Sequence, residues 1–186
     1  MKSVIKMPHL ETRSPASTLF RSALLATLIA SLTACASYRD IAPNSPVSEA
    51  TQIMGQPTHV CSRDDGGQRL VWSTQPMGQY VYGANVGSSG NLIGSVYSVL
   101  TDKNFRKLDS GNWSAHDVLC EFGPPAETEV LGLGEKREQI WSYRYKQNNH
   151  WNQLLHIYMG RDGQQATRWH TGPDPLYERE YFFNGF

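Results

Sequence analysis

The sequence has no apolar run long enough to cross a bilayer. Its most apolar stretch, residues 23–34, is 12 residues long, whereas a membrane-spanning helix needs about 20. It also has no excess of either charge, with 17 basic and 17 acidic residues. A nucleic-acid partner would require a clustered basic surface, so this balance argues against one.

Motifs that carry catalysis or bind cofactors are also missing. No G-x-S-x-G or H-E-x-x-H pattern occurs, and the Gly-rich residues 87–90 are typical of a hairpin turn. The histidines are scattered, and we interpret none of them as paired with cysteine or a carboxylate at a metal-ligand spacing. We therefore expect no catalysis, no cofactor and no metal site. The histidines considered are His59, His116, His150, His156 and His170.

The N-terminus has the pattern of an export signal. A basic segment precedes the apolar residues 23–34, and small residues lead into a cysteine at Leu32-Thr33-Ala34-Cys35. This order resembles the lipobox of bacterial lipoproteins. It predicts cleavage before Cys35, acylation of that residue, and attachment to a membrane by several acyl chains. Since no Asp follows Cys35, the same resemblance implies the periplasmic face of the outer membrane.

Cysteine is scarce, with three residues in the chain. Lipidation accounts for Cys35 and leaves Cys61 and Cys120 in an oxidising compartment, where a disulfide between them is possible. Two free buried thiols explain the same residues equally well. Removal of residues 1–34 would take away four basic residues and one acidic residue, leaving a net charge of −3.

An internal repeat is the most informative feature of the remaining chain. Gly-x-Pro elements at 55–57 and 123–125 are 68 positions apart, and Trp-Ser elements at 72–73 and 141–142 are 69 apart. Each Gly-x-Pro element ends a short amphipathic segment that begins at Ser45 in the first copy and at Ser114 in the second. Ser is a good helix N-cap, and Gly followed by Pro ends a helix.

Strand patterns separated by turn residues follow each expected helix, for example on both sides of residues 64–67. The prediction is an α+β protein of two tandem units, each a helix plus a four-stranded antiparallel sheet, with the helices packed on one face of the sheet. The expected divisions are a signal peptide (1–34), a lipidated linker (35–44), unit 1 (45–110), unit 2 (111–172) and an aromatic C-terminal tail (173–186).

The second copy carries the pattern Gly111-x-Trp113-Ser114-x-x-Asp117-Val118, with Gly123-x-Pro125 after it. It resembles the SmpA/OmlA (BamE-like) family of outer-membrane lipoproteins. The doubled unit is similar to the β-lactamase-inhibitor-protein-like fold. The resemblance implies a non-enzymatic envelope protein whose partners include the β-barrel assembly machinery. That family usually has one unit, so the doubling is a departure.

Aromatic residues supply the candidate binding surface. Alternate residues of a strand share a face, so Tyr80 pairs with Tyr82 and Tyr143 with Tyr145. Tyrosine together with arginine, here Arg144, is common in binding hot spots, and one of these sets could line an open sheet face. The aromatic residues of the tail either pack back on the sheet or dock on a partner.

We therefore expect a lipid-anchored envelope protein that acts by protein–protein interaction, with a role in outer-membrane assembly or integrity. Two alternatives stay open. The doubled unit also fits an inhibitor that holds a periplasmic or secreted enzyme by its sheet face. The aromatic rows also fit a peptidoglycan-binding module.

Overall fold

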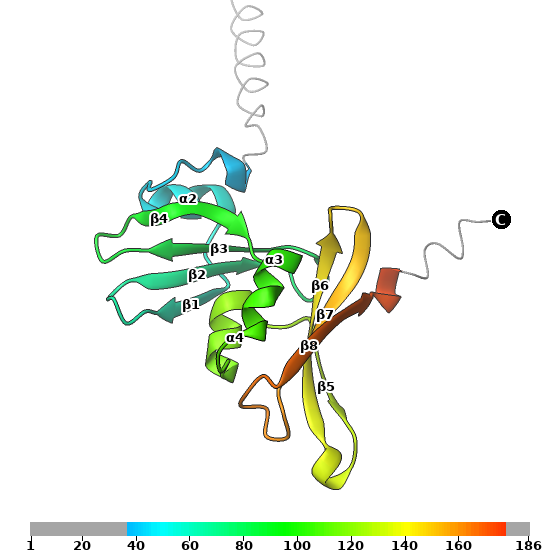
Figure 1. Ribbon diagram of the computed structural model, residues 1–186. Helices are drawn as coiled ribbons and strands as arrows, with labels where there is room; N and C mark the ends of the chain where they lie inside the picture. The colour runs from blue at the N-terminus through cyan, green and yellow to red at the C-terminus, as the bar shows by residue number, and fades with distance from the viewer. Residues whose placement is uncertain (1–36, 178–186) are drawn as a thin grey trace, which may run out of the picture. The chain divides into compact units, whose positions relative to one another are not determined.

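The structure is a computed structural model, described here for residues 37–177. It is an α+β fold with few helices and two four-stranded antiparallel sheets, each with its strands in sequence order (Figure 1). The first sheet contains β1 (His59–Ser62), β2 (Gln68–Ser73), β3 (Val81–Val86) and β4 (Leu92–Ser98). The second contains β5 (Glu127–Leu131), β6 (Glu138–Gln147), β7 (Trp151–Tyr158) and β8 (Arg168–Pro173).

Short helices precede and join the sheets. The α-helices are α2 (Val47–Met54), α3 (Asp102–Phe105) and α4 (Ala115–Phe122). The 3-10 turns are η1 (Tyr38–Asp40), η2 (Arg106–Asp109) and η3 (Gly134–Lys136). Within residues 37–177, no helix is both long enough and apolar enough to cross a membrane. The predicted signal peptide, the lipidation site at Cys35 and residues 178–186 of the predicted tail lie outside the described residues.

Local signals define the ends of α4 as predicted. The Ser114 hydroxyl accepts a hydrogen bond from the Asp117 N–H, and the Asp117 carboxylate accepts one from the Ser114 N–H. This reciprocal pair is a capping box with Asp in place of Glu. At the other end, Gly123 has φ 76° and ψ −172°, a conformation that only glycine adopts readily.

The predicted cap of the first helix is wrong by one residue. The N-cap of α2 is Pro46, which has no side chain to accept a hydrogen bond, while the buried Ser45 hydroxyl has no hydrogen-bond partner. Proline's fixed φ is suited to the start of a helix. Gly55 ends α2 with φ 78° and ψ −172°, nearly the same backbone as Gly123.

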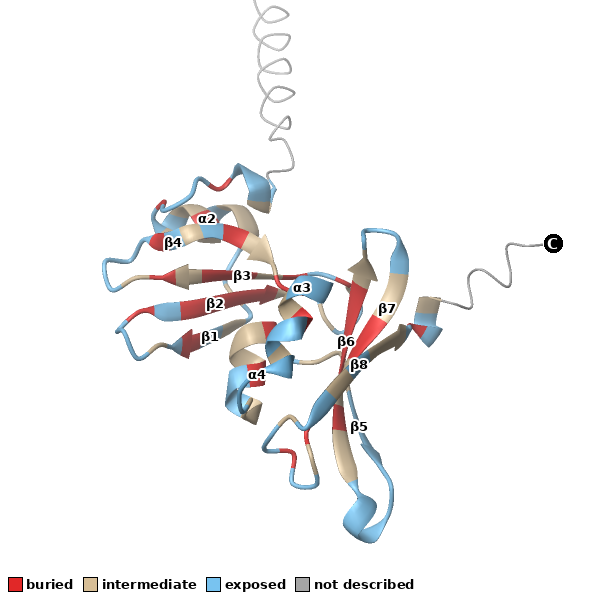
Figure 2. Ribbon diagram, viewed as in Figure 1, coloured by how far each residue is buried: buried red, intermediate tan, exposed pale blue. Residues whose placement is uncertain are grey.

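Helix α4 packs between the two sheets rather than on one of them (Figure 2). Its Val118 and Phe122 share one buried cluster with Val71 of the first sheet and with Tyr143 and Leu155 of the second. Residues four apart lie on the same side of a helix, so one apolar stripe of α4 serves both sheets.

The other face of the first sheet is covered by α2. Leu70 and Trp72 alternate with Val71 along β2 and therefore point away from α4. They pack with Ala50, and the Trp72 indole N–H donates to the Gly55 carbonyl at 2.9 Å. The expectation that helices cover one face and leave the other open is therefore wrong for this sheet.

The predicted linker over residues 35–44 is also wrong where the structure describes it. A capping box between Ser37 and Asp40 orders η1, and Ile41 is 3% exposed among the residues that cover β2. The folded part of the chain thus begins no later than Ser37. The described start of the predicted tail packs back as well, since Asp174 is buried and the Tyr177 hydroxyl donates to the Met77 carbonyl at 2.8 Å.

Candidate functional site

A cleft of about 730 Å³ lies between the end of the first sheet and the β6–β7 hairpin. Its walls come from four stretches that are distant in sequence, at 37–39, 79–82, 98–103 and 145–149. Two of the predicted binding tyrosines, Tyr80 and Tyr82, lie in it. Their neighbour Tyr38 from η1 completes an aromatic wall that the sequence did not indicate, because it requires residues 44 positions apart to meet.

The aromatic wall consists of three neighbouring tyrosine rings. Tyr80 and Tyr82 are almost parallel, with ring centroids 6.2 Å apart. Tyr38 covers the Tyr82 ring at 4.3 Å, and the Arg39 guanidinium donates to the Tyr38 hydroxyl at 3.2 Å. Burial is the main cause that raises the pKa of Tyr82, with the neighbouring tyrosines adding to it. Tyr80 remains 40% exposed, so a flat apolar surface faces the cleft.

The opposite wall is polar and is organised by Asp102, at the start of α3. Its carboxylate accepts hydrogen bonds from the Gln147 amide at 3.0 Å and from the Tyr145 hydroxyl at 3.4 Å. Burial, followed by the Asp102 charge, raises the pKa of Tyr145 to about 12. Asn148 and Asn149 extend the wall from the hairpin, with φ of 51° and 58°.

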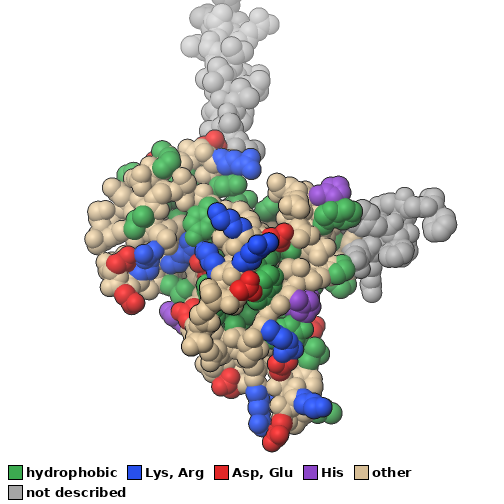
Figure 3. Space-filling model, viewed as in Figure 1, with side chains coloured by type: hydrophobic (Ala, Val, Ile, Leu, Met, Phe, Trp, Pro, Cys, Tyr) green, Lys and Arg blue, Asp and Glu red, His purple; other side chains and the backbone are tan. Residues whose placement is uncertain are grey.

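Both charge signs reach the cleft, since Arg39 and Lys103 lie in its lining together with Asp102. Basic and acidic side chains are also interspersed over the face of the molecule in Figure 3. Aromatic faces, side-chain amides and mixed charge can bind a ligand that combines apolar and amide groups.

The structure corrects the other half of the predicted binding face. Tyr143 is 0% and Tyr145 1% exposed, because this side of β6 faces α4 in the core. The Tyr143 hydroxyl donates to the Gly123 carbonyl at 3.0 Å, and burial raises its pKa. Tyr145 still lines the cleft. These rings hold the fold together and are not an exposed surface.

Arg144 points to the opposite side of β6 and is also buried. Its guanidinium forms ion pairs with Asp174 and Glu127 and donates to the Pro76 carbonyl at 3.0 Å. Gln75 adds hydrogen bonds to the Arg144 backbone. Arg144 therefore ties the β2–β3 connection to the second sheet, which is a structural role rather than the predicted binding role.

A Ser–His pair lies beside Arg144 on the outer face of the second sheet. The Ser142 hydroxyl is 2.8 Å from His156 Nδ1, and burial lowers the pKa of His156. Among the described residues no carboxylate is hydrogen-bonded to this imidazole, so the pair lacks the orienting group of a catalytic triad.

Cys61 and Cys120 form a disulfide, one of the two states that the sequence left open. Their Cα atoms are 5.7 Å apart, and the bond joins β1 to α4. A second link reinforces it. Arg69 passes over Gly83, where any Cβ would meet its guanidinium, and donates to the carbonyls of Cys120 and Glu121 at the C-terminal end of α4. Cations stabilise this end of a helix.

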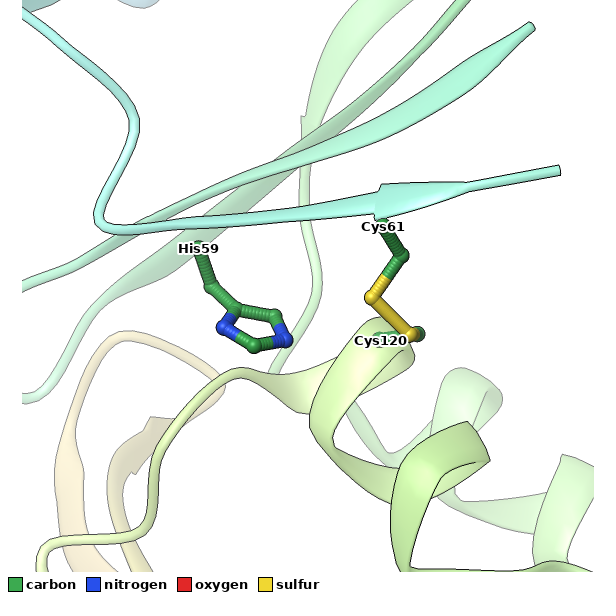
Figure 4. A group of neighbouring side chains, drawn as sticks. All are labelled: His59, Cys61 and Cys120. Atoms are coloured by element: carbon green, nitrogen blue, oxygen red, sulfur yellow. A yellow bond between two sulfur atoms is a disulfide. The ribbon is translucent and has the colours of Figure 1, made fainter.

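Histidines flank this disulfide, contrary to the interpretation that none pairs with cysteine. A ring nitrogen of His59 lies within 4.8 Å of both sulfur atoms (Figure 4). His116 Nε2 is 3.4 Å from the Cys120 Sγ. Two sequence signals could have indicated the cluster. His59 and Cys61 are two apart on a strand, and His116 and Cys120 are four apart on a helix, so each pair shares a face.

Comparison with known proteins identifies no family. No family model matches the chain, and neither a curated protein nor a solved structure matches it significantly. The resemblance to the SmpA/OmlA family therefore stays an expectation.

Proposed function

We propose that this chain is a lipid-anchored envelope protein that acts by protein–protein interaction through the tyrosine cleft, without catalysis. The observation that carries the proposal is that the cleft begins two residues after the predicted lipidation site. Ser37, Tyr38 and Arg39 line the cleft. An extended chain spans about 3.5 Å per residue, so a lipid on Cys35 would lie within about 7 Å of Ser37.

This short connection would keep the cleft near a lipid on Cys35. A lipidated Cys35 would sit at the membrane surface, and only Ala36 would separate it from Ser37, where the capping box of η1 begins. The cleft would then open close to that surface, on its periplasmic side if the lipobox assignment holds. A partner that is itself part of the membrane fits this position better than a freely diffusing one.

The chemistry of the walls favours an extended peptide segment as the occupant. The Gln147, Asn148 and Asn149 amides can pair with peptide N–H and C=O groups, and the Tyr80 and Tyr82 rings can take an apolar side chain. We therefore propose a periplasmic segment of an outer-membrane assembly component as the partner. The BamE-like resemblance points to the same class.

We further propose that the two halves are copies of one helix-plus-sheet unit. The order α2 then β1–β4 recurs as α4 then β5–β8, and both helices have eight residues and end on a glycine with nearly the same φ and ψ. The second copy departs from the first because its helix packs between the two sheets.

The test is co-purification from gently solubilised outer membranes. We expect the tagged protein to recover components of the β-barrel assembly machinery, and Tyr80→Ala with Tyr82→Ala to reduce that recovery strongly. Tyr158→Ala is the matched control, because this half-buried tyrosine lies on the outer face of the second sheet. Cys35→Ala should also lose the partner if proximity to the membrane matters.

Other results would overturn the proposal. Recovery of one soluble periplasmic enzyme by both the lipidated and the Cys35→Ala forms would indicate an inhibitor. Co-sedimentation with purified sacculi that depends on Tyr80 would indicate a glycan-binding module. Mass spectrometry that finds an unmodified Cys35 in the membrane fraction would exclude the lipid anchor.

A further inference from the structure

The disulfide and its two histidines form a group with the composition of a metal site. His59 and Cys61 project from β1 toward α4, and Cys120 and His116 lie one turn apart on α4. The ligand atoms of the first three residues lie within 4.8 Å of one another. The disulfide keeps both sulfurs from acting as thiolates, so in this state the group cannot bind a metal ion as a Cys₂His₂ set.

We propose that the reduced form of this chain binds one Zn²⁺ through Cys61, Cys120, His59 and His116. Zinc prefers four sulfur and nitrogen ligands in a tetrahedral arrangement, with Zn–S distances of about 2.3 Å. Two thiolates on one zinc are therefore about 3.8 Å apart. Breaking the disulfide lets the sulfurs separate to that distance, while β1 and α4 hold His59 beside both sulfurs and His116 beside Cys120.

The surroundings allow this exchange. Cys61 is buried, but Cys120 is half-buried and both border an open pocket of about 460 Å³. Of the two histidines, His116 is exposed beside that pocket and His59 is half-buried. A dithiol reductant and a metal ion can therefore both approach the group from solvent. The pocket lining also holds three carboxylates, from Asp64, Asp65 and Asp117, and two guanidinium groups, from Arg63 and Arg69.

The chemistry balances with a protein dithiol as the reductant. Two electrons and two protons pass from the dithiol to the Cys61–Cys120 bond, leaving two thiols here and one disulfide on the reductant. Binding of Zn²⁺ then releases the two thiol protons, and the metal does not change its oxidation state. The disulfide and the bound metal are therefore mutually exclusive states of one site.

The test uses the full chain carrying Cys35→Ala, so that Cys61 and Cys120 are the only thiols. The protein is reduced with a phosphine, and the phosphine is removed under anaerobic conditions. The reduced protein is then titrated with Co²⁺ and Zn²⁺. We expect one Co²⁺ per chain, with thiolate-to-metal charge transfer and the strong visible absorption of a tetrahedral site. Zinc should displace the cobalt, and the oxidised chain should bind neither.

Single substitutions then assign the ligands. Cys61→Ser should abolish binding, and His59→Ala and His116→Ala should each weaken it by about tenfold or more. His150→Ala, an exposed histidine on the β6–β7 turn, should leave binding unchanged. Near-ultraviolet circular dichroism of each reduced form, with and without metal, reports whether the fold persists.

Two results would overturn the assignment. One is that the reduced chain takes up no stoichiometric cobalt. The other is that binding is as strong in His59→Ala and His116→Ala as in the parent, since thiols of an unfolded chain would behave in that way. The proposed cleft function does not depend on either result.

Discussion

Replacing both Cys61 and Cys120 by alanine is expected to lower the free energy of unfolding by about 4 kcal/mol. The two residues are 59 positions apart, and the cross-link restricts an unfolded loop of that length. The loop-entropy relation gives about 4 kcal/mol at 25 °C for such a loop. For a domain of about 150 residues this corresponds to a fall in melting temperature of about 10 °C.

Chemical denaturation followed by circular dichroism measures this difference. The oxidised parent, the parent under reducing conditions and the double alanine variant are compared, all carrying Cys35→Ala. The reduced parent and the variant should agree within about 1 kcal/mol, because alanine avoids burying a new polar group at Cys61, which is 5% exposed. Without the cross-link the free energy of unfolding should also fall more steeply with denaturant concentration, because the unfolded chain becomes more expanded.

A loss smaller than about 1 kcal/mol would refute the reasoning. It would mean that the bond does not constrain the unfolded chain, or that the two cysteines are not joined in the native protein. Mass spectrometry of alkylated protein separates these explanations, since a native disulfide protects both thiols until a reductant is added.

Three further outcomes are expected. Phe122→Ala should cost about 3–5 kcal/mol in denaturant unfolding, since this fully buried ring packs against three other aromatic rings. Gly123→Ala should cost about 1–3 kcal/mol, because φ is 76° and the new Cβ would lie 3.0 Å from Val71 Cγ1. The pKa of His156 in the folded state is below its ordinary value of 6.5. Just below pH 6.5 the unfolded chain therefore binds more protons than the folded one, so the free energy of unfolding falls as the pH is lowered through this range. In His156→Gln the decrease in the free energy of unfolding that is due to this histidine should disappear. Denaturant unfolding between about pH 5 and pH 7.5 measures the difference.

Local chemistry in the sequence predicted much of the secondary structure. The ends of α4 follow from Ser114, Asp117 and Gly123. Turn residues such as those at 64–67 separated β1 from β2 as expected. These signals act over a few residues, through caps, positive φ and alternation along a strand, so they can be read without the rest of the molecule.

The candidate sites depended on contacts that such signals do not specify. The sequence indicated Tyr80 with Tyr82, but not that Tyr38 covers them or that Tyr145 belongs to the core. It indicated a possible disulfide between Cys61 and Cys120, but it did not indicate that histidines lie beside that bond.

What the sequence by itself determined is that a short helix precedes each group of strands, where α4 begins and ends, and that α4 has one apolar side. Only the tertiary structure decided which surfaces that side contacts. An apolar stripe specifies that a helix will be buried but not against which sheet, because the hydrophobic effect has no direction. Contact of α4 with both sheets buries Tyr143 and brings Cys120 to Cys61.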